Sequence, residues 1–189
     1  MPYSSELDKY VGISTTLHRL TRKKCSIKNY PESFIVEEVL DINHIARAIC
    51  ESEIPPTGDR GIWRFVLVKK NMDTLEAIEK IRNHLKIPHY LIGFCGLKDK
   101  DALTAQYVTV SGITPDKFKS LKCKNMFFRD FEKVSEGLYR SAHMGNFFRI
   151  ILFMEDREIP QIPNTFAIFT ATRGLAHAGQ FLILSVKRL

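Results

Sequence analysis

The chain predicts an α+β domain with a mixed, mostly antiparallel sheet and flanking helices. Strand-like runs rich in β-branched and aromatic residues alternate irregularly with a few helical segments, and this order is typical of α+β domains. With 189 residues, 44% of them hydrophobic, the chain is long enough for one buried core and too short for two typical domains.

The predicted strands differ in character along the chain. The first combines β-branched with acidic residues, the second is centred on Trp63 and Phe65, and the last is fully buried in character. A loop over Ser52–Gly61, with two prolines, separates the first two. The six strands are Phe34–Leu40, Ile62–Val68, Tyr90–Cys95, Tyr107–Ser111, Asn125–Val134 and Phe147–Phe153.

Two helices are predicted among these strands. Asn71 or Asp73 can cap the first helix, which Pro88 ends. Its apolar residues recur at helical spacing and are Leu75, Ile78, Ile81 and Leu85. Thr114 as a cap, followed by proline at the first helical position, starts a short helix over residues 115–122.

The loop over residues 96–106 is the most informative segment, because it places Asp99 between Lys98 and Lys100. Nearby positive charge favours the carboxylate form, so Asp99 is predicted to be a charged nucleophile or base at neutral pH. The loop connects two predicted core strands, which gives a reactive group rigid support. Taken alone, a charged loop of this kind is also compatible with a solvated connection.

Three motifs in the same order resemble the TruD family of tRNA pseudouridine synthases. Residues 96–106 are similar to the signature Gly-Leu-Lys-Asp-Lys-x-Ala-x-Thr-x-Gln. Upstream, residues 27–38 resemble the segment Lys-x-x-Pro-Glu-Asp-Phe-x-Val-x-Glu, with Ser33 where an Asp is usual. Downstream, residues 145–150 resemble Gly-Asn-x-Phe-x-Ile. Together these motifs cover roughly residues 11 to 152 of the chain.

The resemblance implies a pseudouridine synthase fold and the isomerisation of uridine to pseudouridine in tRNA, with Asp99 as the catalytic residue. It further implies that Phe148 stacks on the target base and that Asn146 helps to order the Asp. A core role is the alternative for the aromatic residues. Asp101 occupies a variable position and serves as an internal control. The expected substrate-binding residues are Lys28, Phe34, Lys98, Lys100, Asn146 and Phe148.

The chemistry needs one ionised carboxylate, and we expect no cofactor and no metal. The reaction breaks the bond between C1′ and N1 and rejoins the uracil through C5, all inside one pocket. Asp99 could add to the sugar or the base, or abstract a sugar proton, and the sequence does not decide among these. The four cysteines lie far apart without a Cys-x-x-Cys pair, which indicates neither a zinc knuckle nor a redox motif.

The charge of the chain suits a polyanionic partner such as tRNA or another structured RNA. Lys and Arg exceed Asp and Glu to give a net charge of +7. One basic group contains Arg19, Arg22, Lys23, Lys24 and Lys28, and a second contains Lys117, Lys119, Lys122 and Lys124. No signal peptide or membrane-spanning run is evident, so we expect a cytoplasmic protein without a membrane partner.

The C-terminal part departs from the family pattern. Pro163, Asn164 and Phe166 match a later family motif, but its Gln-Arg-Phe-Gly half has no counterpart. We therefore expect residues 1–152 to be the catalytic region and residues 153–189 a divergent, truncated part of the same domain. Such a chain could self-associate through an incomplete sheet. A non-catalytic RNA-binding remnant of the enzyme is the alternative function.

Overall fold

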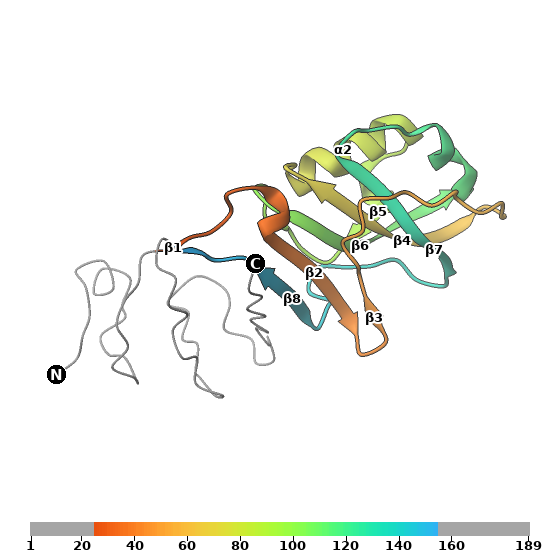
Figure 1. Cartoon of the computed structure of the whole chain (residues 1–189). Coiled ribbons are helices and arrows are strands. Elements are labelled where there is room, and N and C mark those ends of the chain that lie inside the picture. Colours follow the sequence, from red (N-terminus) through yellow and green to blue (C-terminus); the bar gives the residue numbers. More distant parts are fainter. Residues whose placement is uncertain (1–24, 155–189) are drawn as a thin grey trace. The chain divides into compact units, whose positions relative to one another are not determined.

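The computed structural model describes residues 25–154 (Figure 1). Residues 27–152 belong to one compact unit. The short strands β1 (Cys25–Ser26) and β9 (Phe153–Met154) pair antiparallel and belong to a second unit. The basic residues Arg19, Arg22, Lys23 and Lys24 and the motif around Asn164 lie outside the described residues.

A mixed sheet is built around the long strand β6 (Leu103–Ile113). Antiparallel to it runs β4 (Gly61–Lys70), whose other edge pairs with β7 (Met126–Val134). The second edge of β6 pairs in parallel with β2 (Phe34–Asp41) and antiparallel with β5 (Ile92–Phe94). Both β8 (Gly145–Ile150) and β3 (His44–Ile45) pair antiparallel with β2. The prediction of a mixed, mostly antiparallel sheet is confirmed.

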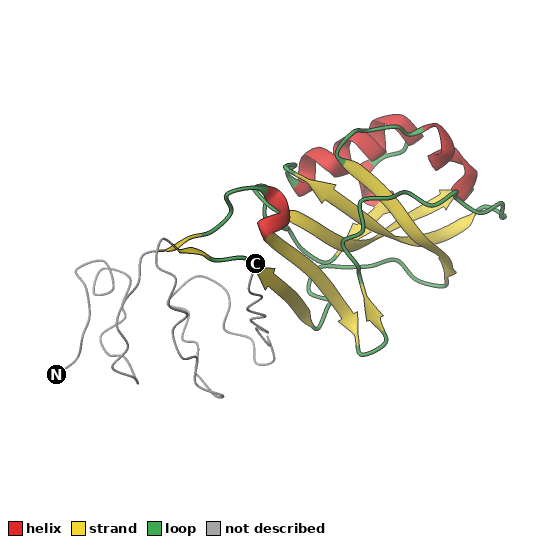
Figure 2. Cartoon of the chain, viewed as in Figure 1, coloured by secondary structure: helices red, strands yellow, loops and turns green. Residues whose placement is uncertain are grey.

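Helix α2 (Thr74–Leu85) packs on the sheet and contributes to the larger core (Figure 2). The Asp73 carboxylate accepts a hydrogen bond from the Leu75 backbone N–H at 2.7 Å, which caps the helix as expected. Leu75 itself is 48% exposed, although its spacing matches that of the buried apolar residues of the helix. The helix ends at Lys86, which adopts a left-handed conformation two residues before the proline that was expected to end it. The buried helical residues Ala77, Ile78, Ile81 and Leu85 meet Phe65, Leu67, Val108 and Val110.

Three local expectations differ from the structure. The strand expected from Tyr90 begins at Ile92, because a 3₁₀ turn, η2 (His89–Leu91), leaves Tyr90 83% exposed. The helix expected over 115–122 is the 3₁₀ segment η3 (Pro115–Ser120), and Thr114 makes no side-chain cap. The last strand ends at Ile150 and is only partly buried, because β8 pairs with a single neighbour among the described strands.

The strand directions bring several segment ends to one edge of the sheet. Because β2 and β6 run parallel, both begin there, and the antiparallel strands β4 and β8 end there. A 3₁₀ turn, η1 (Pro31–Ser33), leads into β2, and the loop over 95–102 leads into β6. The residues of all three sequence motifs therefore meet at this edge. Among the described residues, no helix is long and apolar enough to cross a membrane.

Candidate active site

Asp99 is presented to solvent at this edge and paired with a lysine from the first motif. The Lys28 Nζ lies 3.0 Å from the Asp99 Oδ1, and the two side chains are 30% and 45% exposed. Lys28 adopts a left-handed backbone conformation with φ of 60°. Its ammonium also lies 4.2 Å from the centre of the Phe34 ring, a cation–π distance. Lys28 thus supplies a positive charge directly beside the Asp99 carboxylate.

The two lysines that flank Asp99 occupy different environments. Lys98 is 7% exposed, and its Nζ lies 2.6 Å from the Oε2 of the fully buried Glu38. Removal of one partner of a buried ion pair leaves an uncompensated charge, at a cost of about 3–5 kcal/mol. The Lys98 side chain therefore anchors the loop to β2, whereas its expected role was beside Asp99. Lys100 is exposed and makes no ion pair with the described part of the chain.

A buried lysine holds the main chain of the Asp99 loop. Lys69, at 0% exposure, donates from its Nζ to the Asp99 carbonyl at 2.8 Å and to the Met72 carbonyl at 2.8 Å. A longer bond, 3.3 Å, reaches the Lys98 carbonyl. Burial lowers the pKa of Lys69 to about 8, partly opposed by the negative charges of Asp73 and Asp99. Three carbonyls from two loops thus converge on one ammonium group.

Together with Lys69, two further buried side chains, Thr74 and Gln106, form a clamp that holds the Asp99 loop by hydrogen bonds. The Thr74 hydroxyl accepts from the Lys98 backbone N–H at 3.0 Å and donates to the Gln106 side-chain oxygen at 3.1 Å. The Gln106 amide nitrogen in turn donates to the Gly96 carbonyl at 3.1 Å. Because such networks are costly to leave half satisfied, the backbone on both sides of Asp99 has one preferred path. Gln106 belongs to the signature motif of residues 96–106, whereas none of the three motifs contains Lys69 or Thr74.

The third motif places Phe148 and Asn146 on the same face of the sheet as Phe34. In the β2–β8 register, Phe148 lies opposite Val36 and Asn146 lies opposite Glu38. The Phe148 and Phe34 rings meet edge to face, with centroids 6.2 Å apart and an interplanar angle of 70°. Phe148 is partly buried, whereas Phe34 is only 8% exposed. The Asn146 Oδ1 is buried and has no hydrogen-bond partner within the described residues, so it is an unsatisfied acceptor on this strand.

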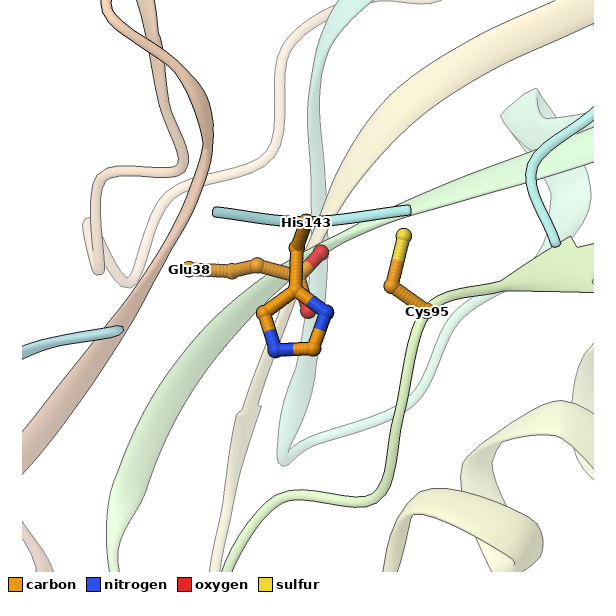
Figure 3. A group of neighbouring side chains, drawn as sticks. All are labelled: Glu38, Cys95 and His143. Atoms are coloured by element: carbon orange, nitrogen blue, oxygen red, sulfur yellow. The ribbon is translucent and has the colours of Figure 1, made fainter. Parts of the chain in front are cut away.

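Glu38 also belongs to a cluster with Cys95 and His143, whose potential ligand atoms lie within 4.8 Å of one another (Figure 3). Burial and the charge of Glu38 raise the pKa of the Cys95 thiol to about 12. Burial and the charge of Lys98 lower the pKa of His143. Both groups are therefore neutral at pH 7, and the Lys98 ammonium already supplies positive charge beside Glu38. The cluster therefore packs beneath the Asp99 loop, and its Cys95 thiol is not activated as a thiolate.

The fold resembles that of a solved structure. A crystal structure from Methanosarcina mazei, assigned to tRNA pseudouridine synthase D, superposes with a TM-score of 0.63. The two sequences are 22% identical, and the superposition covers 77% of this chain and 31% of that structure. The chain thus shares its fold with part of that structure.

The sequence comparisons identify the family. Its model, described as tRNA pseudouridine synthase D (TruD), matches residues 10–172, and the chain belongs to the TruD family. A relative from Archaeoglobus fulgidus named "Probable tRNA pseudouridine synthase D" is 29% identical over 94% of this chain and 44% of its own length. The Aquifex aeolicus tRNA pseudouridine synthase D is 31% identical over 67% of this chain and 30% of its own. The chain therefore spans less than half the length of these relatives.

Proposed function

We propose that this chain isomerises uridine to pseudouridine in RNA, with Asp99 as the catalytic residue and tRNA as the substrate class. The observation that carries the proposal is the solvent-accessible Asp99 carboxylate, paired with Lys28 and held by a buried clamp on its own carbonyl. Membership of the TruD family supports the reaction type. The names of the relatives, which state tRNA, support the substrate class.

The neighbouring side chains fit the steps of this reaction. A base that leaves its stack is held by aromatic contact and polar groups that read its edge. Phe148 supplies an aromatic ring beside the site, and the Asn146 oxygen, buried and without a partner in the described part of the chain, lies two residues away on the same strand. Lys28 holds Asp99 in position, while the exposed Lys100 is free to meet a phosphate. Lys98 contributes through the geometry of the loop, because its charge is matched by Glu38.

Mass-spectrometric mapping of pseudouridine in tRNA incubated with the purified chain tests the proposal. We expect conversion at a defined uridine, and no conversion when the protein is omitted. Tight RNA binding without any conversion would refute the catalytic proposal and favour a non-catalytic RNA-binding protein. Light scattering over a concentration series, run on the same sample, tests the separate prediction of self-association.

Phe148→Ala is expected to slow conversion because the target base loses its stacking partner. Base stacking on an aromatic side chain contributes about 1–3 kcal/mol, which corresponds to roughly a 5- to 150-fold loss of kcat/KM. Phe147→Ala is the matched control, since Phe147 lies on the same strand opposite Glu37 and faces the other side of the sheet. The measurements are single-turnover conversion and thermal unfolding of both variants.

A purely structural Phe148 would give a different pattern. In that case Phe148→Ala would lower the unfolding temperature, and Phe148→Leu would restore both stability and conversion. The stacking role requires that Phe148→Leu restores stability while conversion stays impaired.

A further inference from the structure

A second surface near the Asp99 loop has the features of a ligand groove. It has a volume of about 730 Å³ and lies between residues 52–55 and the segment over 118–128. Phe118, Met126 and Phe128 are nearly fully buried and form part of its apolar lining. The exposed lysines of the lining are Lys119, Lys122 and Lys124.

The charge along this groove is positive and uncompensated. None of the three lysines forms an ion pair with a residue in the described range 25–154. Glu53 is the acidic residue of the lining, and it is already matched: its Oε1 lies 2.8 Å from the Arg129 guanidinium and its Oε2 accepts from the Asp130 backbone N–H. An apolar floor with a cationic rim fits a ligand that alternates flat apolar groups with negative charges.

The groove adjoins the Asp99 loop through β4. Met126, which begins β7 and lines the groove, is the register partner of Lys69, whose ammonium binds the Asp99 carbonyl. The Lys70 backbone N–H also donates to the Asn125 carbonyl at 3.0 Å. The start of β7 thus lies two strand spacings, about 10 Å, from the start of β6 at the same edge of the sheet.

We propose that this groove binds the single-stranded RNA segment that flanks the target uridine. The lysines neutralise phosphates, and the apolar lining, with the exposed Ile54, receives a base. The inference rests on the proposed function, because RNA is favoured over an acidic peptide by continuity with the Asp99 edge. It adds a second contact region that none of the three sequence motifs contains.

Charge reversal tests the groove. The variant Lys122→Glu/Lys124→Glu is compared with Lys86→Glu/Lys133→Glu, which changes the net charge equally at exposed positions outside the groove. We expect the groove variant to raise the Kd for tRNA at least about tenfold and to reduce the slope of log Kd against log salt by about one to two. Conversion at saturating RNA should stay near the wild-type rate. Equal effects of the two variants, or no effect of the groove variant, would overturn the proposal.

A thiol footprint locates the ligand directly. Cys123 is partly exposed and lines the groove, whereas Cys95 is buried. In a chain with Cys25 and Cys50 replaced by Ser, an oligouridine at saturation should slow maleimide labelling of Cys123 about fivefold or more. Protection by oligoglutamate at equal charge concentration would instead assign the groove to an acidic peptide, and absence of protection by either probe would refute it.

The two proposals fail in distinguishable ways. Because Kd and the footprint do not depend on turnover, a chain that forms no pseudouridine can still show the groove effects. Conversely, normal conversion with an unchanged Kd in the groove variant would leave the proposed function intact and remove the groove.

Discussion

Asp99→Asn is expected to abolish pseudouridine formation while RNA binding and the free energy of unfolding change little. The amide keeps the shape of the carboxylate but removes the charge that the reaction uses, so the loss should exceed about 1,000-fold, or about 4 kcal/mol of transition-state stabilisation. The half-exposed position of the side chain makes a large folding defect unexpected. Single-turnover conversion, tRNA binding and thermal unfolding are measured on the same preparation.

Asp101→Asn is the matched control two residues away. Asp101 is exposed and makes no ion pair or side-chain hydrogen bond with the described part of the chain, so the variant should convert at the wild-type rate. Full activity of Asp99→Asn, or an equal loss in both variants, would remove Asp99 from the catalytic role.

Lys69→Met is expected to lower kcat strongly, although Lys69 is too deeply buried to touch the substrate. Its removal leaves the Met72, Lys98 and Asp99 carbonyls without their shared donor, at about 1–3 kcal/mol for each buried group left unpaired. The loop then relaxes to a new path and displaces the Asp99 carboxylate. We expect a loss of about 10- to 100-fold in kcat with little change in KM, measured by steady-state and single-turnover kinetics. Lys70→Met, at a partly exposed neighbour paired with Glu32, should be near wild type.

The pH dependence separates this positioning role from simple packing. Because the pKa of Lys69 is about 8 in the folded chain, the ammonium loses a proton as the pH rises through 8, and two hydrogens then remain for three carbonyls. Activity should fall over this range.

Stability should change in the opposite direction: the folded pKa lies below the unfolded value of 10.5, so the unfolded chain binds more protons between pH 8 and 10.5. The free energy of unfolding therefore gains a contribution over that interval. Lys69→Met should show neither the activity limb near pH 8 nor this gain, and a wild-type profile in Lys69→Met would refute the role.

The elements with strong local signals were predicted well from the sequence. β2, β4, α2 and β7 lie where composition and periodicity place them. β6 extends well beyond the predicted residues 107–111, because pairing with β4 along its whole length recruits neighbours of weaker strand character. Tyr90 and Leu75 show that burial cannot be predicted from spacing alone, because both lie in apolar patterns and are still exposed.

The partners within the candidate site were harder to predict than its members. The motifs located Asp99, but Lys28, 71 residues away along the chain, is paired with it, while the adjacent Lys98 pairs with Glu38. Side chains that are neighbours in a loop diverge in space, so sequence adjacency says little about which charges meet. One sequence feature indicates Lys69 as a buried lysine: it directly follows the apolar run Phe65–Val68.

Successive residues of β4 serve opposite faces of the sheet: Lys69 holds the Asp99 loop, and Lys70 pairs with Glu32 on the way into β2. Insertion or deletion of a single residue within β4 would exchange these faces, so that the residues packed in one core cluster, such as Phe65 and Leu67, would face the other, which holds Val66 and Val68. A two-residue change would restore the faces but move the lysine by one full pleat, about 6–7 Å. The spacing between the β4 core and Lys69 is thus constrained as tightly as the identity of the lysine. Relatives that share this architecture should accommodate length variation in the connections and not in this strand.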